Sequence, residues 1–409
     1  MDTWVVPTLR RVRRRLAAYL IAVLVPLAVL AGGIWLGGHP DRLPDPVRDV
    51  LVGDGEAQLF AEALDDVNAD YYREVPKSEL TDKAIAGMVD SLGDRYSHYF
   101  TPKQFEKYLR DTNAQFTGVG IEVSEHERGL EVVRVYDGSP AQRAGLKPGD
   151  LIVAAGGKRL AGLPSERSSS YIRGREGTTV RLVIVRDGER IEREVERAVV
   201  SVPVVASRMR RTADGTKVAQ VALATFSRGA HGQLRKEIDK RLKQGAKAIL
   251  LDLRHNGGGL LDEARLVASI FIPDGEIVTI KGRNQPSKTL TAAGGAIDED
   301  IPVVVLVDGG TASASEIVAG AIQDRGRGEV VGAPTYGKGV FQEVQRLSNG
   351  GALDLTVGQY FLPSGRNLGG AGVDRGGGVK PDVRVKDDPD TPRDEVVTDA
   401  LTVVAEQLK

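Results

Sequence analysis

The sequence contains no cysteine, and it contains only five histidines. The lack of cysteine excludes a disulfide framework, a thiol nucleophile and any thiolate metal site, and it leaves the redox compartment undetermined. The histidines are scattered without the short spacings typical of zinc ligands, so the sequence predicts no metal and no other cofactor. They are His39, His98, His126, His231 and His255.

The sequence also lacks an excess of charge of either sign. Its 55 basic and 56 acidic residues give a formal net charge of −1, which offers no attraction to nucleic acid. The 409 residues are 41% hydrophobic and show no internal repeat. A chain of this length and composition is expected to fold into two or three domains.

Long apolar runs are rare, and the main one lies near the N-terminus. The stretch from Leu16 to Leu36 carries no charge, and five arginines between positions 10 and 15 precede it. About 20 apolar residues span a bilayer, whereas a signal-peptide core has about 7 to 15. We therefore expect a retained anchor with a cytoplasmic N-terminus and the remainder outside, with a cleaved signal peptide as the alternative. Several prolines mark residues 39–52 as a linker.

The most informative stretch runs from Val303 to Val340. An apolar strand, VVVLV, leads into a glycine-containing turn and then into a helix that Ser313 opens. The first N–H groups of a helix attract negative charge, so the Ser313 hydroxyl and the Ala314 N–H are placed to face one substrate carbonyl. The structural alternative is a capping box, because Glu316 follows three residues after Ser313.

Lys338 also has two interpretations. With Gly332 and Gly337 it completes G-x-x-x-x-G-K, most of a phosphate-binding loop. However, Gly339 replaces the magnesium-binding hydroxyl, and the following VFQEVQRL alternates like a strand. Nucleotide binding is therefore the disfavoured alternative.

Taken together, GGTASASEIVAGAIQD and GEVVGAPTYGKGVFQ closely resemble the C-terminal processing (tail-specific) peptidases, which are Ser-Lys enzymes. The resemblance implies that Ser313 is the nucleophile, Lys338 its base, and Gln342 the residue that holds the lysine. It implies no catalytic role for Thr311, and we expect Ser315 to be structural. Burial is expected to lower the pKa of Lys338 and so make a neutral amine available.

The segment LDLRHNGGG resembles the turn that lends this family a second oxyanion-hole N–H. We favour Gly258 as the donor beside Ala314, with Gly259 as the rival, although a glycine run can simply permit positive φ. Asp252, Arg254 and Asn256 are expected to stabilise the turn. Strands and helices alternate after Val205, which predicts an α/β (α+β) domain, and the resemblance implies the crotonase-like spiral type.

Short alternating runs from about Phe116 predict a β-rich module. TGVGIEV and SPAQRAGLKPGD resemble a PDZ domain, which binds peptide C-termini at a glycine-rich loop and a strand edge. The corresponding loop residues are Gly118, Val119, Gly120 and Ile121. The groove helix is expected within 165–173, where Tyr171 and Ile172 suggest a side-chain pocket.

These expectations divide the chain into six segments. They are a cytoplasmic tail and anchor (1–38), a linker (39–52), a helical segment (53–112), the PDZ domain (113–200), the peptidase domain (201–388) and a C-terminal linker and helix (389–409). No chemistry is assigned to the polar and aromatic turn DRYSHYFTP.

The resulting hypothesis is a membrane-anchored serine endopeptidase that cleaves extracytoplasmic protein tails with apolar C-termini. A homo-oligomer is compatible with it, and neither nucleic acid nor a cofactor is expected as a partner. The alternative is a membrane-anchored PDZ binding protein with a degenerate peptidase domain.

Overall fold

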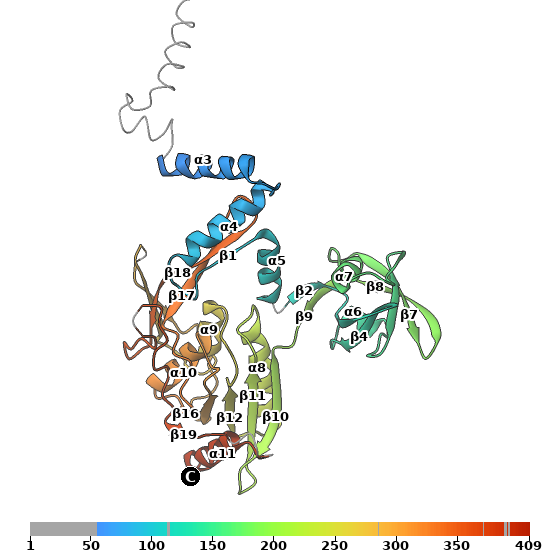
Figure 1. The fold of residues 1–409 in the computed structure, drawn as a ribbon. Coiled ribbons are helices and arrows are strands. Elements are labelled where there is room, and N and C mark those ends of the chain that lie inside the picture. Colours follow the sequence, from blue (N-terminus) through green and yellow to red (C-terminus); the bar gives the residue numbers. More distant parts are fainter. Residues whose placement is uncertain (1–54, 113–114, 285, 371, 388–390, 392) are drawn as a thin grey trace, which may run out of the picture. The chain divides into compact units, whose positions relative to one another are not determined.

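The computed structural model describes residues 55–409, except 113–114, 285, 371, 388–390 and 392 (Figure 1). The chain divides into two compact units at Met88. The expected anchor and the linker 39–52 lie outside the described residues. Within the described residues, no helix is both long enough and apolar enough to cross a bilayer.

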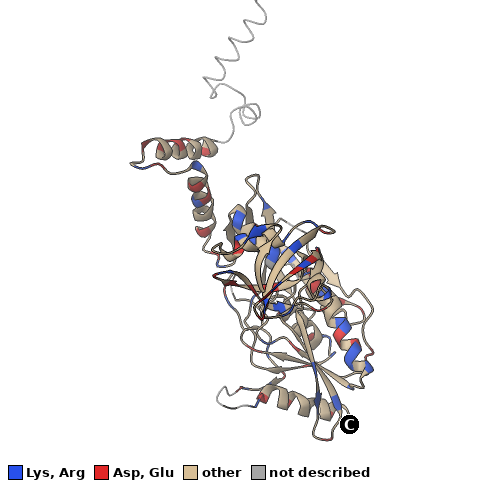
Figure 2. Ribbon diagram, turned by 90° about the vertical axis from the view of Figure 1, so that its right-hand side faces the viewer, with Lys and Arg blue, Asp and Glu red and all other residues tan. Residues whose placement is uncertain are grey.

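The described part of the first unit is helical, as its spacing of apolar residues predicts. It contains α3 (Gly55–Asp70) and most of α4 (Lys77–Asp90), which continues past the division. Every charged residue of α3 is acidic (Figure 2), and none of its residues is buried. Apolar Leu59, Phe60 and Val67 of α3 are exposed.

A six-stranded sheet forms the centre of the second unit. Its order is β10 (Val205–Arg211), β11 (Lys217–Leu223), β12 (Ala248–Asp252), β15 (Val303–Val307), β16 (Glu329–Gly332) and β19 (Val383–Arg384). β10 is antiparallel to β11, and the remaining neighbours are parallel. Every residue of β12 and β15 is buried, which explains why both sequences are continuous apolar runs.

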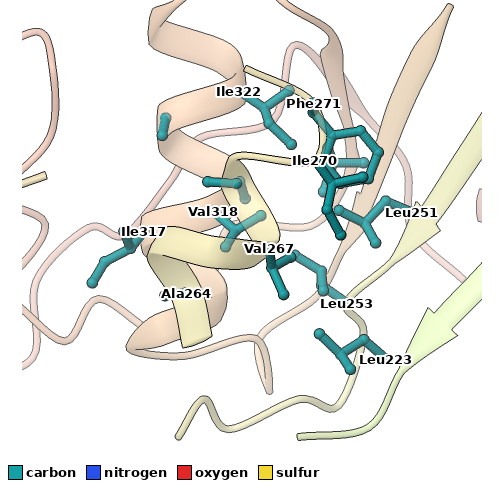
Figure 3. Close-up of a cluster of buried hydrophobic side chains, with 14 of the residues drawn as sticks. Leu223, Leu251, Leu253, Ala264, Val267, Ile270, Phe271, Ile317, Val318 and Ile322 are labelled. Atoms are coloured by element: carbon teal, nitrogen blue, oxygen red, sulfur yellow. The ribbon is translucent and has the colours of Figure 1, made fainter. Parts of the chain in front are cut away.

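Helices cover both faces of this sheet. The side chains of Leu251, Val305 and other alternate strand residues pack under α8 (Ala230–Lys243), α9 (Leu261–Ala268) and α10 (Ala314–Asp324). Figure 3 shows side chains from α9 and α10 meeting residues from the strand ends in this core. On the opposite face, Leu250 and Val304 pack against α11 (Glu395–Gln407).

A second, antiparallel sheet lies in the same unit. Its order is β1 (His98–Phe100), β18 (Ala352–Phe361), β13 (Glu276–Gly282) and β14 (Lys288–Thr291), and β17 (Val340–Arg346) pairs with β18. α5 (Pro102–Asp111) follows β1 and is capped by Thr101. The strand predicted after Lys338 is β17, so the helix that a phosphate-binding loop requires there is absent.

A β-module with its own core interrupts the unit between α5 and β10. Two short strands, β2 (Gln115–Gly118) and β9 (Ala198–Ser201), pair antiparallel where the chain enters and leaves it. A separate hydrophobic cluster that includes Leu130, Ile152 and Leu182 forms its core. Its sheet order is β3 (Ile121–His126), β4 (Gly129–Val135), β5 (Leu151–Ala155), β7 (Thr179–Arg186) and β8 (Glu189–Glu196); β6 (Lys158–Arg159) pairs with β5, and α6 (Pro140–Arg143) and α7 (Ser165–Ile172) complete the module.

Candidate active site

Ser313 stands on a strained turn between β15 and α10. Its φ of 57° and ψ of −117° are unfavourable for a residue with a side chain, at a typical cost of about 1–3 kcal/mol. Buried Thr311 anchors the turn, because its hydroxyl donates to the Leu253 carbonyl at 2.9 Å. Ala314 is the first residue of α10, so its N–H has no acceptor within the helix. The sequence therefore predicts correctly that Ser313 opens a helix.

One buried carboxylate ties this turn to the lysine loop. The Ser313 N–H donates to Glu316 Oε2 at 2.8 Å, which is the glutamate half of the predicted capping box. The same oxygen accepts the Lys338 N–H at 3.0 Å, and Oε1 accepts the Gly337 N–H at 2.7 Å and the Thr335 hydroxyl at 2.5 Å. Burial raises the pKa of Glu316, and these hydrogen bonds oppose the rise. The backbone N–H groups of Ser313 and Lys338 therefore donate to the same carboxylate oxygen.

The Lys338 amine is half-buried and is held by an amide. Its Nζ donates to Gln342 Oε1 at 2.6 Å, and Gln342 Nε2 donates to the Thr356 hydroxyl at 2.9 Å. Desolvation lowers the pKa of Lys338, and the charges of Asp354, Asp94 and Glu316 oppose it. Throughout the described residues, no hydrogen bond joins Ser313 to Lys338.

The glycine turn after β12 lies directly against the serine. A Cβ on Gly258 would lie 2.8 Å from Ser313 Cβ and 2.9 Å from the Ala314 nitrogen, so only glycine fits there. The Gly258 N–H donates to Asn256 Oδ1 at 2.9 Å and is already satisfied in this arrangement. Gly259 lies against the Phe226 backbone, while the Cβ position of Gly257 faces open space.

Asp252, Arg254 and Asn256 stabilise this region, as the sequence predicts. Asn256 is fully buried, and its amide donates to the Leu223 carbonyl at 2.7 Å. Its backbone carbonyl accepts the Ala312 N–H at 3.0 Å and the Ser315 hydroxyl at 2.8 Å. The expected structural role of Ser315 follows from the second contact.

The four predicted peptide-binding residues line one groove in the β-module. The groove has a volume of about 1040 Å³ and includes Gly118, Val119, Gly120 and Ile121, with α7 residues such as Ser169 opposite. Gly120 has a φ of 85°, and a Cβ there would lie 2.3 Å from Ser139 Cβ, so the loop requires glycine. Of the two residues expected to form a side-chain pocket, Ile172 lines the groove. Tyr171 is not among the lining residues and packs against the module core.

Several site residues escape the sequence analysis. Glu316 is visible there only as a helix cap, and its contacts with residues 335–338 have no local signal. Thr356 and Tyr96 are distant in sequence from Lys338 and carry no recognisable pattern. Their contacts with Gln342 and Lys338 depend on how β17, β18 and β1 pair.

Comparison with known proteins identifies the families that three segments of the chain match. The sequence model of peptidase family S41 matches residues 217–385, that of the PDZ domain matches 117–196, and that of the activating protease CtpB N-terminal domain matches 49–103. The carboxy-terminal processing protease CtpA of Bacillus subtilis (strain 168) is 30% identical over 375 residues, which cover 91% of this chain and 78% of the relative. The chain therefore belongs to the carboxy-terminal processing proteases of peptidase family S41.

Two further similarities extend the comparison. A probable CtpA-like serine protease of Staphylococcus haemolyticus (strain JCSC1435) is 32% identical over 332 residues. That alignment covers 81% of this chain but only 65% of the relative, so the chain spans less than two thirds of that protein. Among solved structures, a photosystem II D1 C-terminal processing protease is 29% identical with a TM-score of 0.49, and the match covers 85% of this chain and 97% of that one.

Proposed function

We propose that this protein is a serine endopeptidase of the C-terminal processing type, with Ser313 as nucleophile and Lys338 as general base. The observation that carries the proposal is the shared Glu316 carboxylate, which fixes the backbones of both residues at 2.8 and 3.0 Å from one oxygen. The strained conformation of Ser313 and the lowered pKa of Lys338 support the same assignment.

Catalysis requires the lysine amine to reach the serine hydroxyl at about 2.6 to 3.2 Å. In the proposed reaction, neutral Lys338 leaves Gln342 and accepts the Ser313 proton while the serine oxygen attacks the substrate carbonyl. The protonated amine then gives its proton to the departing amine of the C-terminal fragment. Water, deprotonated by Lys338, hydrolyses the acyl-enzyme and regenerates the serine hydroxyl.

The oxyanion would be stabilised by the Ala314 N–H and an N–H of the glycine turn. Gly258 is the favoured second donor because it lies against both Ser313 and Ala314. Its N–H would have to exchange the Asn256 amide oxygen for the oxyanion. Gly259, the rival donor, is turned toward Phe226.

The proposed substrates are protein tails with free, apolar C-termini. In the PDZ groove, the loop from Gly118 to Ile121 would receive the terminal carboxylate, and the edge of β3 would pair with the peptide. The tail would then lead toward Ser313, so that both domains act on one chain.

We further propose a crotonase-like spiral arrangement for the peptidase domain, a cell-membrane location through residues 1–38, and an extracytoplasmic catalytic domain. The arginine-flanked apolar run supports the anchor. The exposed apolar residues of α3 support a homo-oligomer. Full-length protein should stay in membrane fractions after a carbonate wash, whereas release of a shorter soluble form would indicate a cleaved signal peptide.

The alternative function is a membrane-anchored PDZ binding protein with an inactive peptidase domain. The observation that favours it is that, among the described residues, the Lys338 amine makes no hydrogen bond to Ser313. An arrangement of this kind also fits an enzyme at rest, in which the amine has yet to engage the serine.

The two functions are separated by incubating the full-length protein with an unfolded substrate that has an apolar C-terminus. We expect cleavage by the wild type, and none by Ser313→Ala or Lys338→Ala. Binding without cleavage would favour the inactive PDZ protein, and cleavage by either variant would refute the dyad. Loss of activity in EDTA would point to a metal.

A further inference from the structure

The turn Asp94–Ser97, to which the sequence analysis assigns no chemistry, lies against the proposed base. The Lys338 Nζ is 4.7 Å from the centroid of the Tyr96 ring. The Tyr96 hydroxyl is buried and lies near the Tyr336 phenol. Desolvation, with the neighbouring Tyr336 phenol second, raises the pKa of Tyr96 to about 12, so this side chain stays neutral while the lysine titrates.

A chain of hydrogen bonds links the same turn to the amide that holds Lys338. The buried Ser97 hydroxyl accepts the Thr356 N–H at 3.0 Å, and the Thr356 hydroxyl accepts Gln342 Nε2 at 2.9 Å. Gln342 in turn accepts the Lys338 amine at 2.6 Å. A β-bulge next to Gln342 shifts the register of β17, so that Gln342 lies opposite Thr356.

The turn itself is held firmly. Asp94 accepts the Tyr96 N–H at 2.9 Å with one oxygen and the Ser97 hydroxyl at 2.5 Å with the other. Directly after the turn, β1 pairs with β18, and His98 lies opposite Asp354. Tyr96 and Ser97 are therefore fixed to the strand that carries Thr356.

We propose that Tyr96 and Ser97 are positioning residues of the active site, with the Tyr96 ring shielding the Lys338 amine from water and Ser97 orienting Gln342 through Thr356. This inference rests on the proposed function, because it assumes that Lys338 is the base. It extends the site to a segment that precedes the PDZ domain in the chain.

The effect of this shielding on the pKa of Lys338 has a predictable direction. Asp94, Asp354 and Glu316 place negative charge near the amine and favour its protonated form, while burial favours the neutral form and prevails. His98 lies close enough to affect both Asp94 and Asp354. The ring face also attracts the protonated amine, but this cation–π attraction is weaker than hydration of the charge. Removal of the Tyr96 ring would admit water, so it should raise the pKa of Lys338 and move the rising limb of the pH-rate profile upward.

The test is the pH dependence of kcat and KM for full-length protein on an internally quenched peptide with a free apolar C-terminus. Tyr96→Leu should lower kcat about tenfold or more and leave KM within about twofold. It should also move the rising limb of the pH-rate profile upward by about half a pH unit or more. Tyr96→Phe keeps the ring and should remain within about twofold of the wild type. Ser97→Ala should lower kcat about three- to tenfold.

Matched controls are Tyr72→Leu, at a tyrosine that is 84% exposed, and Ser348→Ala, at an exposed serine of the β17–β18 turn. This inference would be overturned if Tyr96→Leu and Ser97→Ala both kept the wild-type kcat and the wild-type position of the rising limb of the pH-rate profile. If Lys338→Ala were inactive in the same assay, the proposed function would still stand. An active Lys338→Ala would instead overturn the proposed function. Circular dichroism checks the folding of each variant. If Tyr96→Leu does not fold, the kcat of Ser97→Ala decides whether this turn positions the active site.

Discussion

At the scale of single residues, Glu316 connects the two halves of the proposed dyad. A buried carboxylate that accepts four donors is costly to form, because its charge is removed from water. Its acceptor capacity satisfies N–H groups on the serine turn and on the lysine loop at once. The sequence identifies this residue as a helix cap, but a cap alone would not require contacts with residues 335–338.

Substitution of this glutamate tests the connection. Glu316→Gln keeps the shape but replaces one acceptor oxygen by an NH₂ group that faces N–H donors. We expect it to destabilise the protein by about 2–3 kcal/mol and to lower kcat/KM about a hundredfold. Thermal unfolding and peptide cleavage measure the two effects.

Glu263→Gln is a suitable control for this substitution. Glu263 is also buried, and its carboxylate accepts the Gly229 and His231 N–H groups at the start of α8. The control should lose stability and keep its kcat. Equal losses of kcat in the two variants would mean that Glu316 acts only through overall stability.

At the scale of elements, α11 is fastened to the end of β12 by a pair of carboxylates around one guanidinium. Arg254 donates to Asp252 and to Asp394, which caps α11, with distances of 2.8 to 3.0 Å. The Arg254 side chain is only 14% exposed. Although burial opposes it, hydrogen bonds from Arg254 and the Val397 N–H keep the pKa of Asp394 below its usual range.

Breaking this arrangement should loosen α11. Arg254→Ala leaves the buried Asp252 carboxylate without its cationic partner and with only the Gln220 amide as a side-chain donor, so we expect a loss of about 3–5 kcal/mol in the free energy of unfolding. Asp394→Asn should lose less, because Asp252 still pairs with Arg254. Denaturant unfolding at pH 7 measures both losses, and exposed Asp399→Asn on the same helix is the control.

The pH dependence of the Asp394 contribution has a definite sign. A depressed folded-state pKa means that the contribution is fully present above the ordinary value of about 3.9 and is lost as pH falls through the folded-state value. The stability difference between wild type and Asp394→Asn should therefore shrink in acid. A difference that stays constant down to pH 2 would contradict the ion pair.

The elements also show what the sequence alone can predict. The buried runs of β12 and β15, the strand after Lys338 and the helix that Ser313 opens all follow from local patterns, and the structure confirms them. The contact between Ser97 and Thr356 joins residues 259 positions apart, so no local pattern could predict it. The hydrogen bond from the Gly258 N–H could not be predicted either, because the sequence identifies its partner Asn256 only as a turn residue.

At the scale of the whole molecule, a PDZ domain with its own core is inserted into the chain ahead of the peptidase sheet. An independent core lets the groove bind a peptide without rebuilding the catalytic sheet. If the groove selects substrates, changes at the peptide C-terminus should alter KM, whereas changes at Ser313 should alter kcat.

Amidation of the substrate C-terminus tests this separation. The groove loop would lose a carboxylate partner, so we expect KM to rise about tenfold or more while kcat changes little. The same peptide with its free carboxylate is the control, and binding to Ser313→Ala measures affinity without turnover. An unchanged KM would exclude the groove as the recognition site.

The central claim, that a half-buried Lys338 with a lowered pKa activates Ser313, is tested most directly by covalent labelling of Ser313 with a small serine-reactive phosphonofluoridate across pH. Intact-mass and peptide mapping would follow the rate in wild type, Lys338→Ala and Lys338→Arg. We predict labelling at Ser313 in the wild type, with a rate that rises through a pKa below the ordinary lysine value of about 10.4, and a rate close to background in both variants. Labelling of Lys338→Ala at the wild-type rate and pH dependence would contradict the account.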